Sequence, residues 1–118
     1  MSKNLKTVVL FFENLEYVVL PSFYFLELQV KEEQTTTFTI SEQANRSVAQ
    51  FEGDFYRPLL LFERLTKYSD ITHIELVYDD ETTEEFELNW SEEDDEYNRY
   101  QTFSFTDTGD LHIEIKPQ

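Results

Sequence analysis

Apolar and polar residues alternate along most of this chain with the two-residue period of half-buried β-strands. The alternation is clearest at Ile71–Asp79 and Leu111–Lys116, whereas Thr7–Phe12 has the long apolar run of a fully buried strand. Short polar segments separate neighbouring strands, so we expect them to pair as antiparallel hairpins. The expected pairs are Thr7–Phe12 with Glu16–Leu20, Phe23–Lys31 with Gln34–Ile40, Ile71–Asp79 with Glu85–Trp90, and Gln101–Thr106 with Leu111–Lys116.

The strand pattern also predicts which side chains face the core. Between Phe23 and Lys31 the parity places Leu26, Leu28 and Val30 on one apolar face. In the strand that begins at Glu85, the same rule turns Phe86, Leu88 and Trp90 inward. The aromatic run around Phe23 is interpreted as a cap on the core rather than as a contact surface.

One segment has helical periodicity. Apolar residues recur at helical spacing across Pro58–Tyr68, and proline is tolerated at the first helical position. The pattern assigns no structure to Ser41–Tyr56. The sequence therefore predicts an α+β fold, in which an antiparallel, largely meandering sheet of six to eight strands has one main helix packed on a face.

Composition narrows the class of protein. With 118 residues, of which 40% are apolar, the chain suits a single domain with its own core, spanning 1–118. The absence of cysteine excludes disulfides and thiolate metal sites, which fits a reducing cytoplasm. The longest apolar run, Val8–Phe12, is too short to span a membrane.

The negative charge is concentrated in one quarter of the chain. The formal net charge is −16, and residues 70–96 hold 13 of the 25 acidic residues without a lysine or arginine. Such charge repels nucleic acid and anionic membranes, so the expected partner is a basic protein. The candidate partner-binding residues are Glu75, Asp79, Asp80, Glu81, Glu84, Glu85, Glu87, Glu92, Glu93, Asp94, Asp95 and Glu96, with Tyr97 and Tyr100 as aromatic anchors beside them.

Strand geometry suggests how these acids are arranged. Parity turns Glu75 and Asp79 outward on one strand and Glu85 and Glu87 outward on the next. Outward carboxylates on a strand stand about 6.6 Å apart, and adjacent strands about 4.8 Å apart, which is comparable to phosphate spacing along a nucleic acid. Like charges opposite one another destabilise a sheet, so we interpret the cluster as kept for binding. The competing interpretation is a solvated face that only maintains solubility.

Enzymatic chemistry finds little support. His73 and His112 both fall on outward strand positions, and with only two glycines no phosphate-binding loop can be written. An exposed acidic lattice does not give two carboxylates separate acid and base roles. The acids at 79–81 and 92–96 do not match an EF-hand loop, so we expect no specific metal site and no cofactor.

Three stretches carry a resemblance: FENLEYVVLP, YSDITHIELVYDD, and SEEDDEYNRYQ leading into FTDTGDLHIEI. Together they resemble small uncharacterised proteins of Gram-positive phages and mobile elements, and the chain is similar in character to DNA-mimicking anti-CRISPR and anti-restriction inhibitors. That resemblance implies a protein that occupies the basic nucleic-acid channel of a host nuclease.

These observations leave three candidate functions for the protein. The first is an acidic inhibitor that mimics nucleic acid and binds a CRISPR effector nuclease or restriction enzyme. The second is a phage structural or assembly protein, or another non-catalytic interaction protein, that uses its aromatic surface. The third is an enzyme or metal-dependent module, for which the sequence offers no specific motif. The oligomeric state stays open, including a homodimer through a self-paired edge strand.

Overall fold

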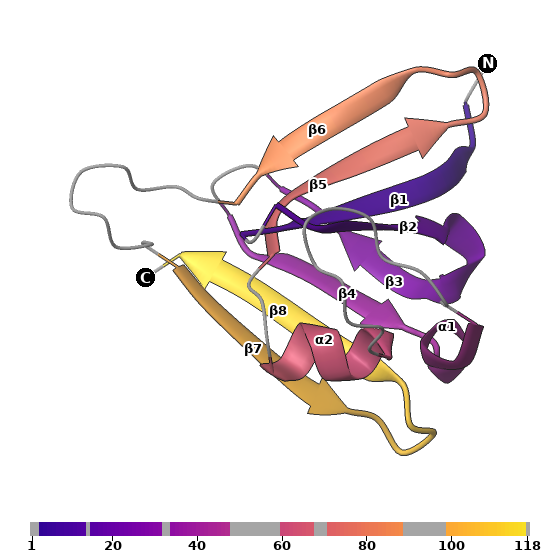
Figure 1. Cartoon of the computed structure of the whole chain (residues 1–118). Coiled ribbons are helices and arrows are strands. Elements are labelled where there is room, and N and C mark those ends of the chain that lie inside the picture. The colour runs from indigo at the N-terminus through magenta and orange to yellow at the C-terminus, as the bar shows by residue number, and fades with distance from the viewer. Residues whose placement is uncertain are drawn as a thin grey trace.

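The computed structural model describes residues 3–13, 15–31, 34–47, 60–67, 71–88 and 99–117, and it confirms an α+β fold (Figure 1). Eight antiparallel strands form two four-stranded sheets, and helices accompany them. The elements are β1 (Leu5–Phe12), β2 (Tyr17–Pro21), the 3₁₀ turn η1 (Ser22–Tyr24), β3 (Phe25–Gln29), β4 (Thr36–Ile40), α1 (Glu42–Ser47), α2 (Leu61–Lys67), β5 (Ile71–Tyr78), β6 (Thr83–Glu87), β7 (Arg99–Phe105) and β8 (Leu111–Pro117).

All four expected hairpins form, although Trp90, expected to face inward at the end of the third, lies outside the described residues. The hairpins are shared between the sheets in a regular way. Sheet A has the order β2-β1-β5-β6, and sheet B has the order β3-β4-β8-β7. Each sheet therefore takes one hairpin from the first half of the chain and one from the second. The joints between hairpins, β1 with β5 and β4 with β8, are also antiparallel. Neither half of the chain can complete a sheet alone, which favours cooperative folding of the whole domain.

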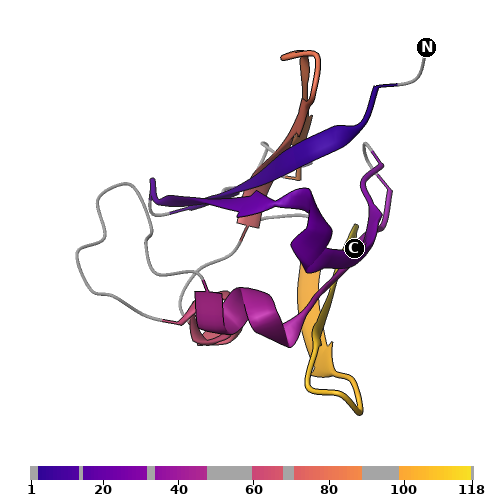
Figure 2. The same cartoon turned by 90° about the vertical axis from the view of Figure 1, so that its right-hand side faces the viewer.

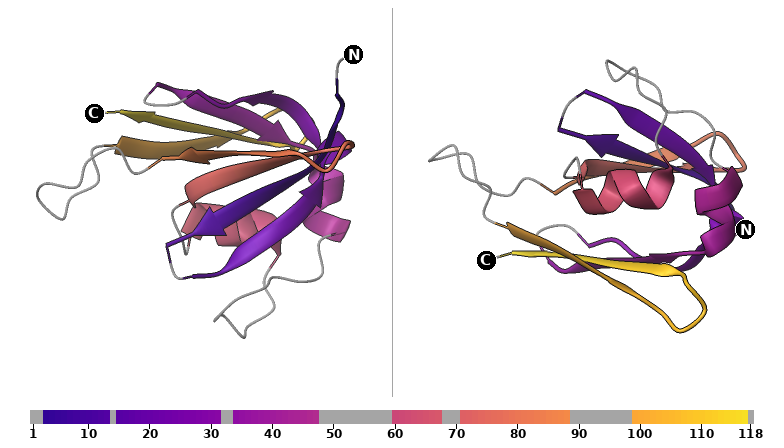
Figure 3. Two further views of the ribbon diagram at one scale, coloured as in Figure 1. Left: turned by 90° about the horizontal axis from the view of Figure 1, so that it is seen from above. Right: turned by 60° about the horizontal axis from the view of Figure 1, so that its bottom comes forward.

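The sheets are set at an angle to each other, and the two helices lie in the angle between them (Figures 2 and 3). One continuous core joins all of these elements. Sheet A contributes side chains such as Val8, Leu10 and Ile74, and sheet B contributes Phe38 and Ile113, all of them fully buried. The main helix α2 buries Leu61, Phe62 and Leu65 in the same cluster.

A series of polar contacts runs from sheet B through both helices to sheet A. Asp110, after the β7–β8 turn, accepts a hydrogen bond from the Glu42 amide at the start of α1, with an N–O distance of 2.8 Å. Asn45 of α1 accepts one from the Phe62 amide of α2, also at 2.8 Å. Each side chain satisfies an amide that a helix leaves unpaired in its first turn.

The last contact in this series is a buried ion pair. The Nε of Arg64, on α2, lies 2.9 Å from a carboxylate oxygen of Glu16, in the β1–β2 turn, and both side chains are fully buried. Burial raises the pKa of the Glu16 carboxyl, and the adjacent guanidinium offsets part of that rise. Helix α2 is thus held to sheet A by charge, while Phe62 packs against Phe105 of sheet B with ring centroids 6.2 Å apart.

Three hairpin turns share one backbone geometry. In each, a residue at or just after the end of the first strand donates its N–H to the carbonyl of the residue four positions later. The residue before that carbonyl donates its own N–H back to the carbonyl of the first residue. The residue that donates back has a left-handed backbone, as expected for a three-residue hairpin loop with a bulge. The turns are Phe12–Glu16, Tyr78–Thr82 and Thr106–Asp110, and the left-handed residues are Leu15 (φ 69°), Glu81 (φ 71°) and Gly109 (φ 84°).

Several details differ from the expectation. Helix α1 lies in Ser41–Tyr56, to which the sequence assigned nothing, and α2 begins at Leu61, while Pro58 lies outside the described residues. Leu26 does not face the core: a register shift between Phe25 and Glu27 breaks the strand parity and leaves Leu26 59% exposed. Phe23 belongs to η1 and is 72% exposed, so it does not cap the core, whereas Tyr24 and Phe25 pack against it. Among the described residues, no helix is long and apolar enough to cross a membrane.

Candidate binding face

The described acids of the 70–96 segment lie mainly on the β5–β6 hairpin, at one edge of sheet A. Ile74 and Leu88 of this hairpin are fully buried in the core, so the residues of opposite parity face away from it. Glu75 stands directly opposite Glu85, and His73 opposite Glu87. The expected outward placement of Glu75, Glu85 and Glu87 is therefore confirmed, and β6 is an outer strand with one open side.

The Glu75–Glu85 contact is close. The Tyr78 amide bonds to the Thr82 carbonyl and the Leu88 amide to the Thr72 carbonyl, which fixes the alternation of pairs along this hairpin. By that alternation Glu75 and Glu85 form a non-hydrogen-bonded pair, the type in which facing side chains come closest. Partial burial raises the pKa of Glu75, a hydrogen bond and repulsion from Glu85 raise it further, and His73 opposes the rise. Protonation of Glu75 therefore relieves the repulsion across this pair.

The turn of this hairpin is exposed and acidic, and its carboxylates serve the turn itself. Asp79 is not a strand residue, because β5 ends at Tyr78. It exchanges hydrogen bonds with Asn4, at 2.9 Å and 3.2 Å. Asp80 accepts bonds from the amide and hydroxyl of Thr82, and these lower the pKa of Asp80. Asp79 and Asp80 thus hold the loop, and all three acids at 79–81 extend the acidic edge.

Glu84 points to the other side of the hairpin. Its parity is that of Phe86 and Leu88, and it accepts a 2.5 Å hydrogen bond from the Tyr78 hydroxyl. Lys3 lies over the Tyr78 ring, with its ammonium 4.5 Å from the centroid. Glu84 consequently does not share the outer face with Glu75 and Glu85, although it belongs to the same exposed edge.

The other half of the outer face of sheet A is apolar, a feature that the charge count did not reveal. Val9 is only 7% exposed although it lies outside the core cluster, and it faces Val19 on one side and Glu75 on the other. In the next row Phe11 faces Tyr17 and stacks on His73, with ring centroids 4.0 Å apart. The face thus passes from apolar on β2 and β1 to acidic on β5 and β6. The strand sequences hold this information, but only the pairing of β1 with β5 brings the two halves together.

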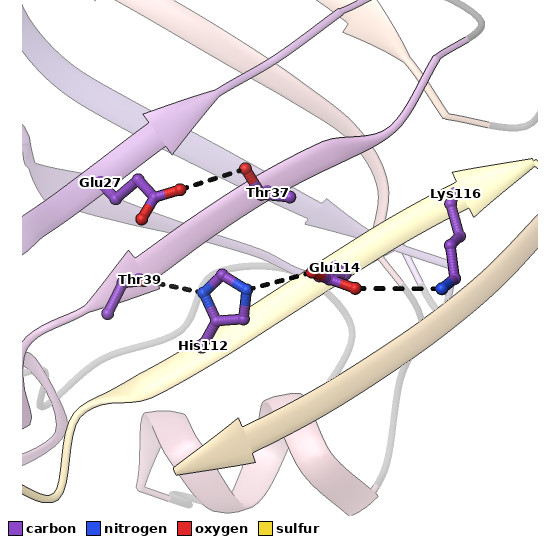
Figure 4. Close-up of polar contacts among 6 residues, drawn as sticks. All are labelled: Glu27, Thr37, Thr39, His112, Glu114 and Lys116. Atoms are coloured by element: carbon purple, nitrogen blue, oxygen red, sulfur yellow. Dashed lines mark hydrogen bonds and ion pairs between the residues drawn. The ribbon is translucent and has the colours of Figure 1, made fainter. Parts of the chain in front are cut away.

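The outer face of sheet B is different (Figure 4). Glu27 accepts a hydrogen bond from Thr37, and Glu114 lies 3.4 Å from the His112 ring nitrogen and 4.0 Å from the Lys116 ammonium. His112 also bonds to Thr39 at 2.9 Å. Both histidines occupy the outward positions expected from parity, and both have defined neighbours. The acids of sheet B are paired with cations and hydroxyls, whereas Glu75 has another carboxylate opposite it.

Part of the expected site lies beyond what the structure describes. Glu92, Glu93, Asp94, Asp95, Glu96 and Tyr97 fall outside the described residues, and only the backbone of Tyr100 is described. That backbone belongs to β7, opposite Lys116 in sheet B, and not to the sheet that holds Glu75 and Glu85. The described part of the site is therefore the β5–β6 hairpin and the apolar strip beside it.

No group of three or more histidine or acidic side chains suited to hold a metal occurs within the described ranges. A comparison with protein-family models, curated proteins and solved structures finds no match to this chain. The interpretation of the site accordingly depends on its geometry.

Proposed function

We propose that this protein is a non-catalytic acidic inhibitor that binds the basic surface of a nucleic-acid-binding protein through the outer face of sheet A. The partner class is a nuclease such as a CRISPR effector or a restriction enzyme. The observation that carries the proposal is the facing pair Glu75 and Glu85, which the fold holds together without a lysine or arginine on either strand. Because like charges across a sheet cost about 0.2–1 kcal/mol, a basic partner is the natural source of compensation.

The composition of the face supports a protein partner. A row of carboxylates provides acceptors for the arginine and lysine side chains that normally hold phosphates. The neighbouring strip, with Val19 49% exposed beside Phe11 and Tyr17, offers apolar contact that a purely electrostatic mimic would lack. Charge would then set the association rate and the partner class, and the apolar strip would add affinity.

The binding test compares two double variants of equal charge. Glu85→Lys with Glu87→Lys alters the acidic face, and Glu13→Lys with Glu27→Lys alters exposed acids elsewhere. The first variant should still fold, because the lysine introduced at position 85 would face Glu75 as an opposite charge. Circular dichroism checks that both variants keep the sheet structure.

Each protein is immobilised and exposed to bacterial lysate at low and high salt, and the bound proteins are identified by mass spectrometry. Wild type and the Glu13/Glu27 variant should capture the same nucleic-acid-binding protein, releasable by salt and by added duplex DNA. The Glu85/Glu87 variant should lose it. Capture that is equal for all three proteins, or that DNA does not displace, would reject the proposal.

The assembly role remains the second candidate because of exposed aromatic side chains away from the acids. Phe23 is 72% exposed, and Phe103 and Phe105 are 49% and 57% exposed. An assembly contact of this kind should survive reversal of the acids on β6.

A further inference from the structure

We propose that two copies of this chain associate through β7, whose open edges pair antiparallel and join the two B sheets into a single sheet of eight strands. β7 is an outer strand of sheet B, and within the described part of the chain it pairs with β8 alone. In the proposed dimer, β7 of the second copy pairs with this open side. This inference does not depend on the function proposed for the acidic face.

The four outer strands of the molecule differ in how well they resist pairing. β6 carries three glutamates in five residues, β3 contains a register shift at Leu26, and β2 ends in Pro21, which has no N–H to donate. β7 has none of these devices. It is the longest of the four, its register with β8 is continuous over seven pairs, and residues 100–105 include no charge, proline or glycine.

The backbone of β7 presents a regular row of groups at the open side. Thr106 donates its N–H to Asp110, which fixes the alternation along the β7–β8 ladder. It follows that Thr102 and Ser104 exchange bonds with β8, while Gln101, Phe103 and Phe105 direct their N–H and C=O groups outward. An antiparallel copy centred on Phe103 places outward groups opposite outward groups, which allows six inter-chain hydrogen bonds in this register.

The side chains of β7 suit the same register. Residues 102–105 are all exposed, and Phe103 and Phe105 lie edge to face with centroids 6.1 Å apart. Pairing about Phe103 would set this ring opposite its own copy, and aromatic cross-strand pairs stabilise sheets. In the same register, position 99 of one chain, an arginine, pairs with position 107 of the other, an aspartate, at both ends of the paired strands.

Charge and size indicate a weak dimer. Each copy carries a net charge of −16, so the two chains repel each other at long range. Two half-exposed phenylalanines per chain provide on the order of 400 Å² of apolar area for the pair, well below a standard interface of about 1,600 Å². Added salt screens the repulsion and should strengthen the dimer, whereas it should weaken binding of a basic protein to the acidic face.

Sedimentation velocity tests the proposal at protein concentrations up to about 1 mM, where a contact of this size class is populated. Wild type should show a monomer–dimer equilibrium that shifts toward dimer in high salt. Phe103→Lys places a charge on the edge, as natural edge strands do, and should weaken dimerisation about tenfold or more. Phe23→Lys changes a phenylalanine outside β7 that is even more exposed than Phe103, and this variant should dimerise as wild type does.

A cross-link tests the register separately. Because the protein has no cysteine, Phe103→Cys introduces a single thiol, which should form a disulfide-linked dimer on mild oxidation, while Phe23→Cys should not. Wild type that stays monomeric at both salt concentrations would overturn the proposal, as would a Phe103→Lys variant that dimerises like wild type. Glu85→Lys with Glu87→Lys should retain the dimer, so failure here is separable from failure of the inhibitor function.

Discussion

Sheets A and B share one plan and differ in what they turn outward. Each combines two hairpins, one from each half of the chain, and each places its inner face on the common core. On sheet B the outward carboxylates are matched by hydroxyls, a histidine and a lysine. On sheet A Glu75 and Glu85 face each other beside an apolar strip.

The difference shows that the fold does not require the acidic cluster. The same strand order is satisfied on sheet B by a mixed polar surface, whereas sheet A retains a repulsive pair at its edge. The outer strands of the two sheets also differ in charge, since β6 is rich in glutamate and β7 is uncharged from residue 100 to 105. We therefore propose a basic partner for sheet A and a neutral strand as the partner of sheet B.

The largest effect is expected where α2 joins the two sheets. Arg64→Met leaves the buried Glu16 carboxylate without its guanidinium and should lower the free energy of unfolding by about 3–5 kcal/mol. Urea unfolding followed by circular dichroism measures the loss. Adding Glu16→Leu to Arg64→Met should recover much of it, because no charge then remains buried. A loss below about 1 kcal/mol would show that this ion pair does not hold α2 to sheet A.

The contact between the helices should have a smaller effect. Asn45→Ala removes the acceptor for the Phe62 amide at the start of α2 and should cost about 1 kcal/mol. Asn45→Asp keeps an oxygen at this position and adds a charge that the helix N-terminus favours, so it serves as the control. Hydrogen exchange at the Phe62 amide should accelerate in the alanine variant only. Equal exchange in both variants would count against Asn45 as a cap.

The sequence predicted the hairpins well because the core faces impose a strict period of two. Ile113 and Ile115 in β8, or Ile74 in β5, fix parity since each must be buried. The prediction for Leu26 was wrong, because a local register shift changes which side chains face the core without changing the alternation of apolar and polar residues in the sequence. Helix α1 has a single buried residue, Ala44, so its apolar periodicity was too weak to predict it.

The candidate site was only partly predictable for a related reason. Parity alone placed Glu75, Glu85 and Glu87 outward. The apolar strip beside them depends on β1 pairing with β5, which are about sixty residues apart in the chain and share no local turn. Charge counting identified the acidic segment, but only strand order revealed that Val9 and Phe11 border it.

Substitutions in the matching hairpin turns of the two sheets should change the stability of the protein in opposite directions. Gly109, in the β7–β8 turn, adopts φ 84° without strain, whereas Glu81 holds φ 71° in the matching β5–β6 turn. Gly109→Ala should destabilise the protein by about 1 kcal/mol, and Glu81→Gly should stabilise it by a similar amount. A Cβ at Gly109 would lie 3.9 Å from Glu42, so crowding does not add to the cost. Thermal unfolding measures both, and Glu81→Gln controls for the lost charge. Equal effects of Glu81→Gly and Glu81→Gln would assign the gain to charge rather than to the backbone.

The smallest effect concerns the acidic pair itself and gives sheet A a pH dependence. Because the pKa of Glu75 is raised in the folded state, the folded protein binds more protons than the unfolded chain at and above the ordinary value of 4.5. Stability should therefore fall as pH rises through this window.

Glu85→Gln removes the facing charge, so it should stabilise the protein by about 0.2–1 kcal/mol at neutral pH and flatten the slope of stability against pH. Glu16, whose pKa is also raised, contributes a slope of the same sign that remains in the variant. Urea titrations between pH 4 and 8 compare wild type with the Glu85→Gln variant. A slope that Glu85→Gln does not reduce would show that the two carboxyl groups titrate independently, and the outer faces of the two sheets would then differ in composition but not in coupling.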